Sequence, residues 1–201
     1  RVTIPARTAT TKLIVVVRAA DATDYDRILD VLVDAGIGSV ELTLTTPGTL
    51  ERLPHLLDRF GDAADIGVGT VTDAEQLAAA IDAGAHYLVT PITDTHLVQT
   101  AHRAGVPMVP GGLTPTELFA AWQAGAAAVK IFPANQVGAG YVKDLRGPFP
   151  EIAVVPSGGV DLRGAVAWLA AGAAAVSVGG PLLGDAVRGG RAARQGPARR
   201  P

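Results

Sequence analysis

Residues 125–134 read GAAAVKIFPA and place one lysine, Lys130, inside an otherwise apolar run. A short apolar run with glycine before it and proline after it is typical of a buried strand in a parallel sheet. Burying an ammonium group is costly, and an amine that gives up its proton becomes a nucleophile able to attack a carbonyl carbon. Lys130 is therefore a candidate Schiff-base lysine. The alternative is a lysine that reaches water at the strand end or pairs with a carboxylate.

The same arrangement of a helical segment, an Ala-Gly step and an apolar strand recurs along the chain. Glycine just past a helix is the usual stop signal, and a unit of about 20–25 residues is one strand plus one helix with short loops. The repeat is marked by Gly36, Gly84, Gly105, Gly125 and Gly172, with Gly61 and Gly147 inside the two longer intervals. We expect strands at Leu13–Arg18, Ser39–Leu44, Ile66–Thr70, Tyr87–Thr90, Met108–Pro110, Ala128–Phe132, Ile152–Pro156 and Ala175–Val178. We expect helices at Asp24–Asp34, Pro47–Phe60, Asp73–Ala83, Asp94–Ala104, Thr116–Ala124, Gly140–Arg146, Leu162–Ala171 and from Pro181.

Eight alternating units with near-continuous apolar strands indicate a single-domain (β/α)8 barrel, the TIM-barrel fold, over residues 1–188. A doubly wound open sheet is the alternative, but it usually carries a glycine-rich first turn, and residues 18–21 read RAAD. Residues 189–201 contain four arginines, no acidic residue and little apolar content. We expect them to form a disordered basic tail.

The composition narrows the classes of partner. The chain has 201 residues, a formal net charge of −2 and no cysteine. A near-neutral charge favours neither nucleic acid nor an anionic membrane as a partner, and the lack of cysteine excludes disulfides and thiolate chemistry. No apolar stretch reaches the roughly 18 residues of a membrane span, and Arg1–Lys12 has no signal-peptide pattern. We expect a cytoplasmic protein.

In a barrel of this kind the active site lies at the C-terminal ends of the strands. Glu41 interrupts the second strand and, by the two-residue period of strands, shares a face with Thr43 and Thr45. Lys130 is a possible partner for this inward carboxylate. The pair is then either a structural ion pair or a general acid/base and a nucleophile. We favour the second interpretation, because opposite charges inside a core seldom raise stability.

Two glycine pairs follow the seventh and eighth strands, where many barrels bind phosphate. The first stretch contains Ser157, Gly158 and Gly159, and the second contains Gly179 and Gly180 at the start of a short helix. Glycines let backbone N–H groups approach an anion, and a helix N-terminus favours negative charge. We therefore expect these residues to hold a phosphate.

Arg18 ends the first strand, beside the strand that carries Glu41 and Thr45, and we expect both Arg18 and Thr45 to bind the substrate. A planar guanidinium there can hold a carboxylate or a phosphate through two parallel hydrogen bonds. The alternative is a salt bridge from Arg18 to Glu41 or Asp21. The histidines show no shared metal-ligand spacing, so no metal site and no cofactor are predicted; they are His55, His86, His96 and His102.

Together these stretches resemble the 2-keto-3-deoxy-6-phosphogluconate (KDPG) and 4-hydroxy-2-oxoglutarate (KHG) aldolases, class I pyruvate-dependent aldolases of the Entner–Doudoroff pathway. The matching stretches run in order from residue 13 to about residue 185. They are VVVRA (15–19), VELTL (40–44), GVGTV (67–71), VTP (89–91), VPG (109–111), VKIFPA (129–134), PSGGV (156–160) and VGG (178–180).

The resemblance implies a homotrimeric lyase that cleaves KDPG reversibly to pyruvate and glyceraldehyde 3-phosphate. It gives Lys130 the Schiff base and Glu41 the general acid/base role. It places Thr70 and Pro91 in the pyruvate pocket, and it assigns the phosphate to the two glycine loops.

The chain departs from the family pattern at Thr45, where many members carry arginine, and at Pro181, where some carry serine. The family's final helix is also missing or altered after Gly189. KHG and 2-keto-3-deoxy-6-phosphogalactonate are alternative substrates. Rivals of other classes are a phosphate-binding barrel isomerase or decarboxylase that uses lysine only as a charge, and a sugar-phosphate-binding barrel without catalysis.

Overall fold

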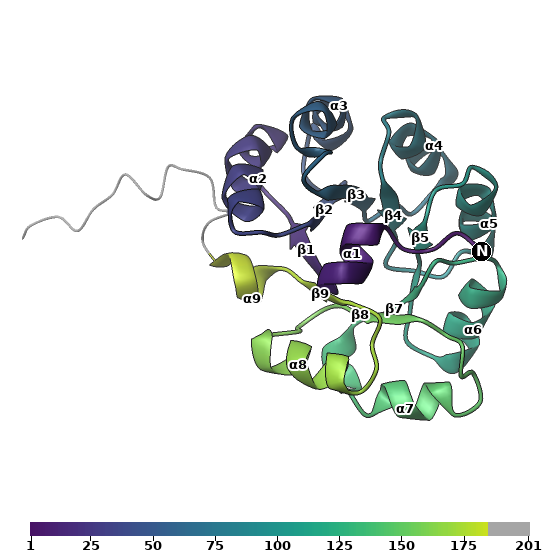
Figure 1. The fold of residues 1–201 in the computed structure, drawn as a ribbon. Coiled ribbons are helices and arrows are strands. Elements are labelled where there is room, and N and C mark those ends of the chain that lie inside the picture. Colours follow the sequence, from purple (N-terminus) through teal and green to yellow (C-terminus); the bar gives the residue numbers. More distant parts are fainter. Residues whose placement is uncertain (185–201) are drawn as a thin grey trace, which may run out of the picture.

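The computed structural model describes residues 1–184, in which a ring of helices surrounds a barrel of parallel strands (Figure 1). The strands are β1 (Leu13–Val17), β2 (Ser39–Thr43), β3 (Asp65–Gly69), β4 (Tyr87–Val89), β5 (Met108–Val109), β6 (Gly111–Gly112), β7 (Val129–Ile131), β8 (Val154–Pro156) and β9 (Val176–Val178). The helices are α1 (Ala6–Thr11), α2 (Tyr25–Asp34), α3 (Thr49–Phe60), α4 (Ala74–Asp82), α5 (Thr95–Arg103), α6 (Pro115–Gln123), α7 (Tyr141–Arg146), α8 (Leu162–Ala170) and α9 (Gly180–Leu183).

The strands pair around the barrel in chain order. One sheet has the order β5-β4-β3-β2-β1-β9 and a second has the order β6-β7-β8. β5 falls within the fifth predicted strand, Met108–Pro110, and β6 continues it beyond the predicted end. Pro110 separates the two because proline has no N–H to donate. β5 pairs with β4 and β6 pairs with β7, so this strand joins the two sheets. Ala174 N donates to Val154 O (2.9 Å) and brings β9 beside β8. The predicted (β/α)8 barrel is confirmed.

Several helices begin at caps that the sequence already displays. Thr114 and Glu117 form a reciprocal capping box at the start of α6. Asp73, Asp94 and Asp161 accept backbone N–H groups at the starts of α4, α5 and α8. Each cap satisfies N–H groups that a helix leaves free at its first turn. The caps therefore fix where the loops that follow β3, β4 and β8 end.

The alternation of side chains along the strands divides the core into two layers. Val15, Val40 and Val68 belong to the large cluster that the strands share with the helices. Ile14 and Tyr87 belong to a smaller cluster, which fills the interior of the barrel. Every second residue of a strand faces inward, so the inward positions run from this apolar layer to the C-terminal edge of the barrel.

Helix α1, which the sequence pattern did not predict, covers the N-terminal ends of the strands (Figure 1). Thr8 is buried; its N–H donates to Asp65 Oδ2 (3.0 Å) and its hydroxyl donates to Ser39 Oγ (2.7 Å). Ser39 and Asp65 are the first residues of β2 and β3, and Ser39 Oγ also bonds the hydroxyl of Tyr87 (3.1 Å). Burial raises the pKa of the Tyr87 hydroxyl well above its usual range, so this group remains neutral. The contacts close one end of the barrel with a polar network.

The observed boundaries leave several predicted strand residues in the adjoining loops. Arg18 follows β1 and Thr70 follows β3, both at the C-terminal edge of the barrel. The predicted boundary at residue 188, the basic tail 189–201 and the change after Gly189 lie outside the described residues. No helix within residues 1–184 is long and apolar enough to cross a membrane.

Candidate active site

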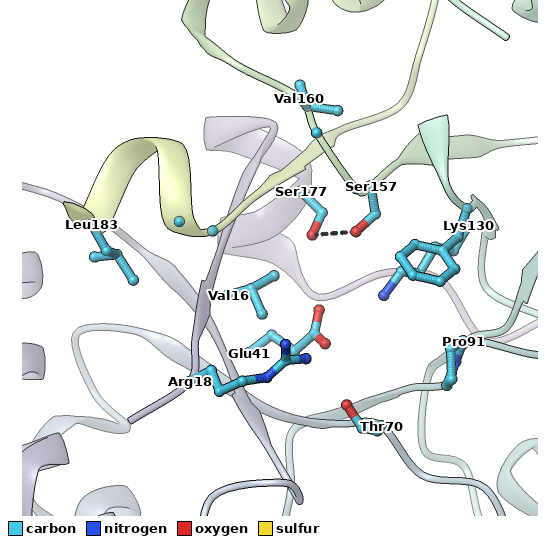
Figure 2. A pocket seen from close by; sticks show the side chains of 15 residues that line it. Val16, Arg18, Glu41, Thr70, Pro91, Lys130, Ser157, Val160, Ser177 and Leu183 are labelled. Atoms are coloured by element: carbon cyan, nitrogen blue, oxygen red, sulfur yellow. Dashed lines mark hydrogen bonds between the residues drawn. The ribbon is translucent and has the colours of Figure 1, made fainter. Parts of the chain in front are cut away.

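A cavity of about 420 Å³ opens at the C-terminal edge of the barrel (Figure 2). Its walls come from β1, β2, β7 and β9, from the loops after β1, β3, β4, β7, β8 and β9, and from α9. The lining residues are Val16, Arg18, Glu41, Thr70, Pro91, Lys130, Phe132, Ser157, Gly158, Gly159, Val160, Ser177, Gly179, Gly180 and Leu183. The structure thus brings together every predicted site residue except Thr45.

Lys130 is the middle residue of β7 and is only 7% exposed. Its N–H donates to Pro110 O (2.7 Å), which anchors the strand backbone beside β6. Its amine points into the cavity, 5.1 Å from the ring centroid of Phe132, the next inward residue along the chain. An amine so placed is shielded from water on one side and open to a ligand on the other.

Glu41 is the middle residue of β2, and its carboxylate reaches into the same cavity (Figure 2). The residue is 2% exposed, and its Oε2 has no hydrogen-bond partner among the described residues. The ion pair with Lys130 that the sequence left open does not form within residues 1–184, where no carboxylate oxygen of Glu41 lies within 4 Å of the Lys130 amine. A buried polar atom without a partner is uncommon and often marks a functional group. The arrangement therefore favours an acid/base role for Glu41 over a structural one.

Arg18 reaches the rim of the cavity from the end of β1, and Thr45 orients it from outside the lining. Arg18 Nε donates to Thr45 Oγ1 (3.0 Å), which also bonds Thr43 Oγ1 (3.0 Å). Neither alternative salt bridge of Arg18, to Glu41 or to Asp21, is present within residues 1–184. Asp21 instead accepts the N–H (2.9 Å) and the hydroxyl (2.7 Å) of Thr23, and the hydroxyl bond above all lowers the Asp21 pKa. The guanidinium is thus left to face the cavity.

Thr70 and Pro91 also line the cavity; in Figure 2 Thr70 lies below Glu41, and Pro91 lies below Lys130. Thr70 has a left-handed backbone, with φ of 65°, which is a genuine outlier for a β-branched residue. Such strain persists where the surroundings impose it, and it clusters at functional sites. The hydroxyl of Thr70 points toward the middle of the cavity (Figure 2).

The two glycine loops converge on the opposite wall. Gly158 and Gly159 both have a left-handed backbone, with φ of 88° and 72°. A Cβ at Gly159 would lie 2.8 Å from Asn135 Cβ, so this loop has no room for a side chain there. Gly179 and Gly180 line the same cavity at the start of α9. Bare backbone from two loops therefore faces one end of the cavity.

Five lining residues were missed in the sequence: Val16, Phe132, Val160, Ser177 and Leu183. The strand period contains a signal for three of them, since each lies two residues from a predicted site residue and shares its inward face. Ser177, for example, precedes Gly179 and accepts a hydrogen bond from Ser157 Oγ (3.2 Å; dashed in Figure 2). Val160 lies in the loop after β8 and Leu183 lies in α9, so the strand period does not apply to either. Among residues 1–184, no three His, Cys, Asp or Glu side chains are grouped to hold a metal ion.

Comparison with known proteins identifies the family. The family model described as "KDPG and KHG aldolase" matches residues 4–191. A 2-dehydro-3-deoxy-6-phosphogalactonate aldolase of Escherichia coli is 38% identical over 75% of this chain and 74% of its own length. A 2-dehydro-3-deoxy-phosphogluconate aldolase of Pseudomonas aeruginosa is 36% identical over 70% of this chain and 64% of its own length.

A crystal structure of the KDPG aldolase from Legionella pneumophila superimposes with a TM-score of 0.82 at 27% identity, over 90% of this chain and 88% of that chain. Its description states that pyruvate is captured there at low pH as a covalent carbinolamine intermediate. The resemblance noted from the sequence motifs is thereby confirmed. The chain belongs to the KDPG and KHG aldolase family of enzymes.

Proposed function

We propose that the chain cleaves KDPG reversibly to pyruvate and glyceraldehyde 3-phosphate through a Schiff base on Lys130. The observation that carries the proposal is one cavity that holds a buried amine, two bare glycine loops and a buried carboxylate whose Oε2 has no hydrogen-bond partner among residues 1–184. The carbinolamine described for the Legionella relative supports the same chemistry here. A substrate with a keto carbon at one end and a phosphate at the other matches the two ends of the cavity.

The reaction begins when the Lys130 amine adds to the C2 carbonyl carbon and forms a carbinolamine, which loses water to give an iminium ion. Glu41 takes the proton of the C4 hydroxyl, the C3–C4 bond breaks, and its electron pair moves into the iminium to form an enamine. The C4 fragment leaves as glyceraldehyde 3-phosphate. Glu41 returns the proton to the enamine carbon, and water hydrolyses the resulting iminium to pyruvate and the free amine.

Borohydride trapping tests the Schiff base directly. With pyruvate and borohydride, we expect a reduced pyruvyl adduct on the peptide that contains Lys130. The chain has only two other lysines, Lys12 and Lys143, so peptide mass spectrometry assigns the site without ambiguity. If pyruvate binds and no adduct forms, the lysine acts only as a charge, and the isomerase, decarboxylase or binding-barrel interpretations replace the aldolase.

The galactonate epimer, 2-keto-3-deoxy-6-phosphogalactonate, is a second candidate substrate, because the E. coli relative at 38% identity is named for it. Comparing kcat/KM for the two epimers and for unphosphorylated KHG decides the substrate class. If the glycine loops bind phosphate, kcat/KM should be higher for both phosphorylated acids than for KHG. If kcat/KM for KHG equals that for the phosphorylated acids, the loops shape the barrel instead of binding phosphate.

Replacing Arg18 with methionine should raise KM for pyruvate and for the sugar acid by roughly 10–100-fold, because a charge-assisted contact to an anionic group is lost. Steady-state kinetics measures the effect, with Arg103→Met, an exposed change on α5, as the control. Adding Thr45→Arg should restore part of the loss if the anion can be held from either strand. An unaltered KM with a shifted pH profile would instead mean that Arg18 tunes Glu41.

We also propose a homotrimeric assembly and a cytoplasmic location, which the family resemblance supports. Sedimentation equilibrium of the purified chain measures the first, and fractionation of the source cells measures the second.

A further inference from the structure

The two successive inward positions of strand β3, 67 and 69, are both glycine. The outward residues between and before them, Ile66 and Val68, pack in the cluster shared with the helices. Neither glycine has a left-handed backbone. The backbone at these positions therefore accepts an L-residue, and the reason for glycine must lie in the space that a Cβ would fill.

That space belongs to side chains of the two neighbouring strands. A Cβ at Gly67 would lie 2.4 Å from the ring of Tyr87, which leans across from β4. A Cβ at Gly69 would lie 2.0 Å from Oε1 of Glu41, 2.6 Å from its Cδ and 2.7 Å from its Cγ. Glu41 pairs in register with Gly67, so its side chain runs toward the C-terminal edge and lies over Gly69.

Among the described residues, no hydrogen bond or ion pair competes with this packing in placing the carboxylate. Oε2 of Glu41 has no hydrogen-bond partner, and no ion pair to Glu41 exists, within the described part of the chain. A long side chain without such ties is placed by the surfaces around it. The surface directly under the carboxylate is the bare Cα of Gly69, and even a methyl group there would displace it.

We infer that Gly69 is a positioning residue for Glu41. Because Gly69 has no side chain, the Glu41 carboxylate can occupy the space above its Cα and face Lys130. The inference rests on the proposed role of Glu41 as proton carrier, and it adds a residue that touches neither substrate nor the reacting lysine. Gly69 is not itself part of the cavity lining. Its effect on the reaction passes entirely through Glu41.

Gly69→Ala should lower kcat roughly 10–100-fold, because a displacement of about 1 Å in a catalytic group has effects of this size, with little change in KM for pyruvate. Exchange of the pyruvate methyl protons should fall in parallel. Gly140→Ala is the matched control, since Gly140 has no atom within 4 Å of an added Cβ and lies outside the cavity. Unchanged turnover in a folded Gly69→Ala protein overturns the inference.

A double-mutant cycle separates positioning from a general structural effect. In a Glu41→Gln background, where the isosteric amide meets the same clash but moves no proton, Gly69→Ala should add less than about a twofold further loss. Losses that multiply would show that Gly69 acts through the fold, and the inference would be wrong.

Thermal unfolding covers the case in which Gly69→Ala lowers stability enough to obscure the kinetics. All three atoms nearest the added Cβ belong to Glu41 beyond its Cβ. The loss in Tm caused by Gly69→Ala should therefore largely disappear in a Glu41→Ala background. An equal loss in both backgrounds overturns the inference. This readout does not depend on catalysis, so it stands even if borohydride trapping contradicts the Schiff base.

Discussion

Lys130→Arg should lose aldol cleavage almost completely, with kcat falling on the order of 10⁴-fold or more, because removing a covalent nucleophile removes the whole intermediate pathway. Arginine keeps the positive charge of Lys130 at the cavity wall, but its guanidinium remains protonated and forms no Schiff base. The variant should still bind a phosphorylated acid, since the glycine loops and Arg18 are untouched. Coupled assay of pyruvate release measures the turnover, and borohydride reduction should leave the variant unlabelled.

Lys143→Arg is the matched control for this experiment. Lys143 lies exposed on α7 and is replaced by the same residue, so activity and labelling at Lys130 should both survive. A Lys130→Arg protein that keeps a large part of its turnover would show that only the charge at this position matters. The reaction would then be one that polarises its substrate without a covalent intermediate.

Glu41→Gln should lower kcat by roughly 10²–10⁴-fold, the range expected for loss of a positioned general acid/base. Glutamine fills the same space but neither accepts nor returns a proton at the substrate hydroxyl and the enamine carbon. Exchange of pyruvate methyl protons, followed by NMR in deuterated water, should slow by a comparable factor. Glu151→Gln, an exposed change in a turn after α7, provides the control.

The stability of Glu41→Gln distinguishes the acid/base role from a structural one. Because the carboxylate is buried without an ion-pair partner among the described residues, removing its charge should leave the free energy of unfolding unchanged or raise it. Denaturant unfolding of both proteins measures this difference. A protein that unfolds readily while its folded fraction stays fully active would mean that Glu41 only supports the barrel.

The barrel could be predicted from the sequence because its signals are local and repeated. Eight apolar strands alternate with helices, seven glycines mark helix ends, four helices begin at a side-chain cap, and the strand period directs Glu41 inward. Helix α1 could not be found in this way. Its residues ARTATT have no apolar stripe, and the helix is tied down by contacts of Thr8 with Ser39 and Asp65, which lie 31 and 57 positions further along the chain.

The site residues were easier to predict than their contacts. Alternation says which side chains face the cavity, but it does not say how far each one reaches. The Glu41–Lys130 ion pair is therefore absent from the described residues although both groups face one cavity. For the same reason alternation did not show that Thr45 lies outside the cavity, where it accepts a hydrogen bond from Arg18. The fifth strand is interrupted at Pro110. The sequence shows this proline, but the prediction only ended the strand Met108–Pro110 there.

The segment that leads into helix α1 also decides where this barrel can be attached to something else. Residue 1 is fastened at the closed end, where the Arg1 guanidinium stacks 3.7 Å from the ring centroid of Trp122 and bonds the carbonyl oxygen of Ala126, just before β7. Leu183, near the end of the described chain, instead borders the open cavity. A surface, a dye or a second enzyme joined ahead of residue 1 would leave the entrance clear. The same cargo joined directly to residue 184 would stand beside it.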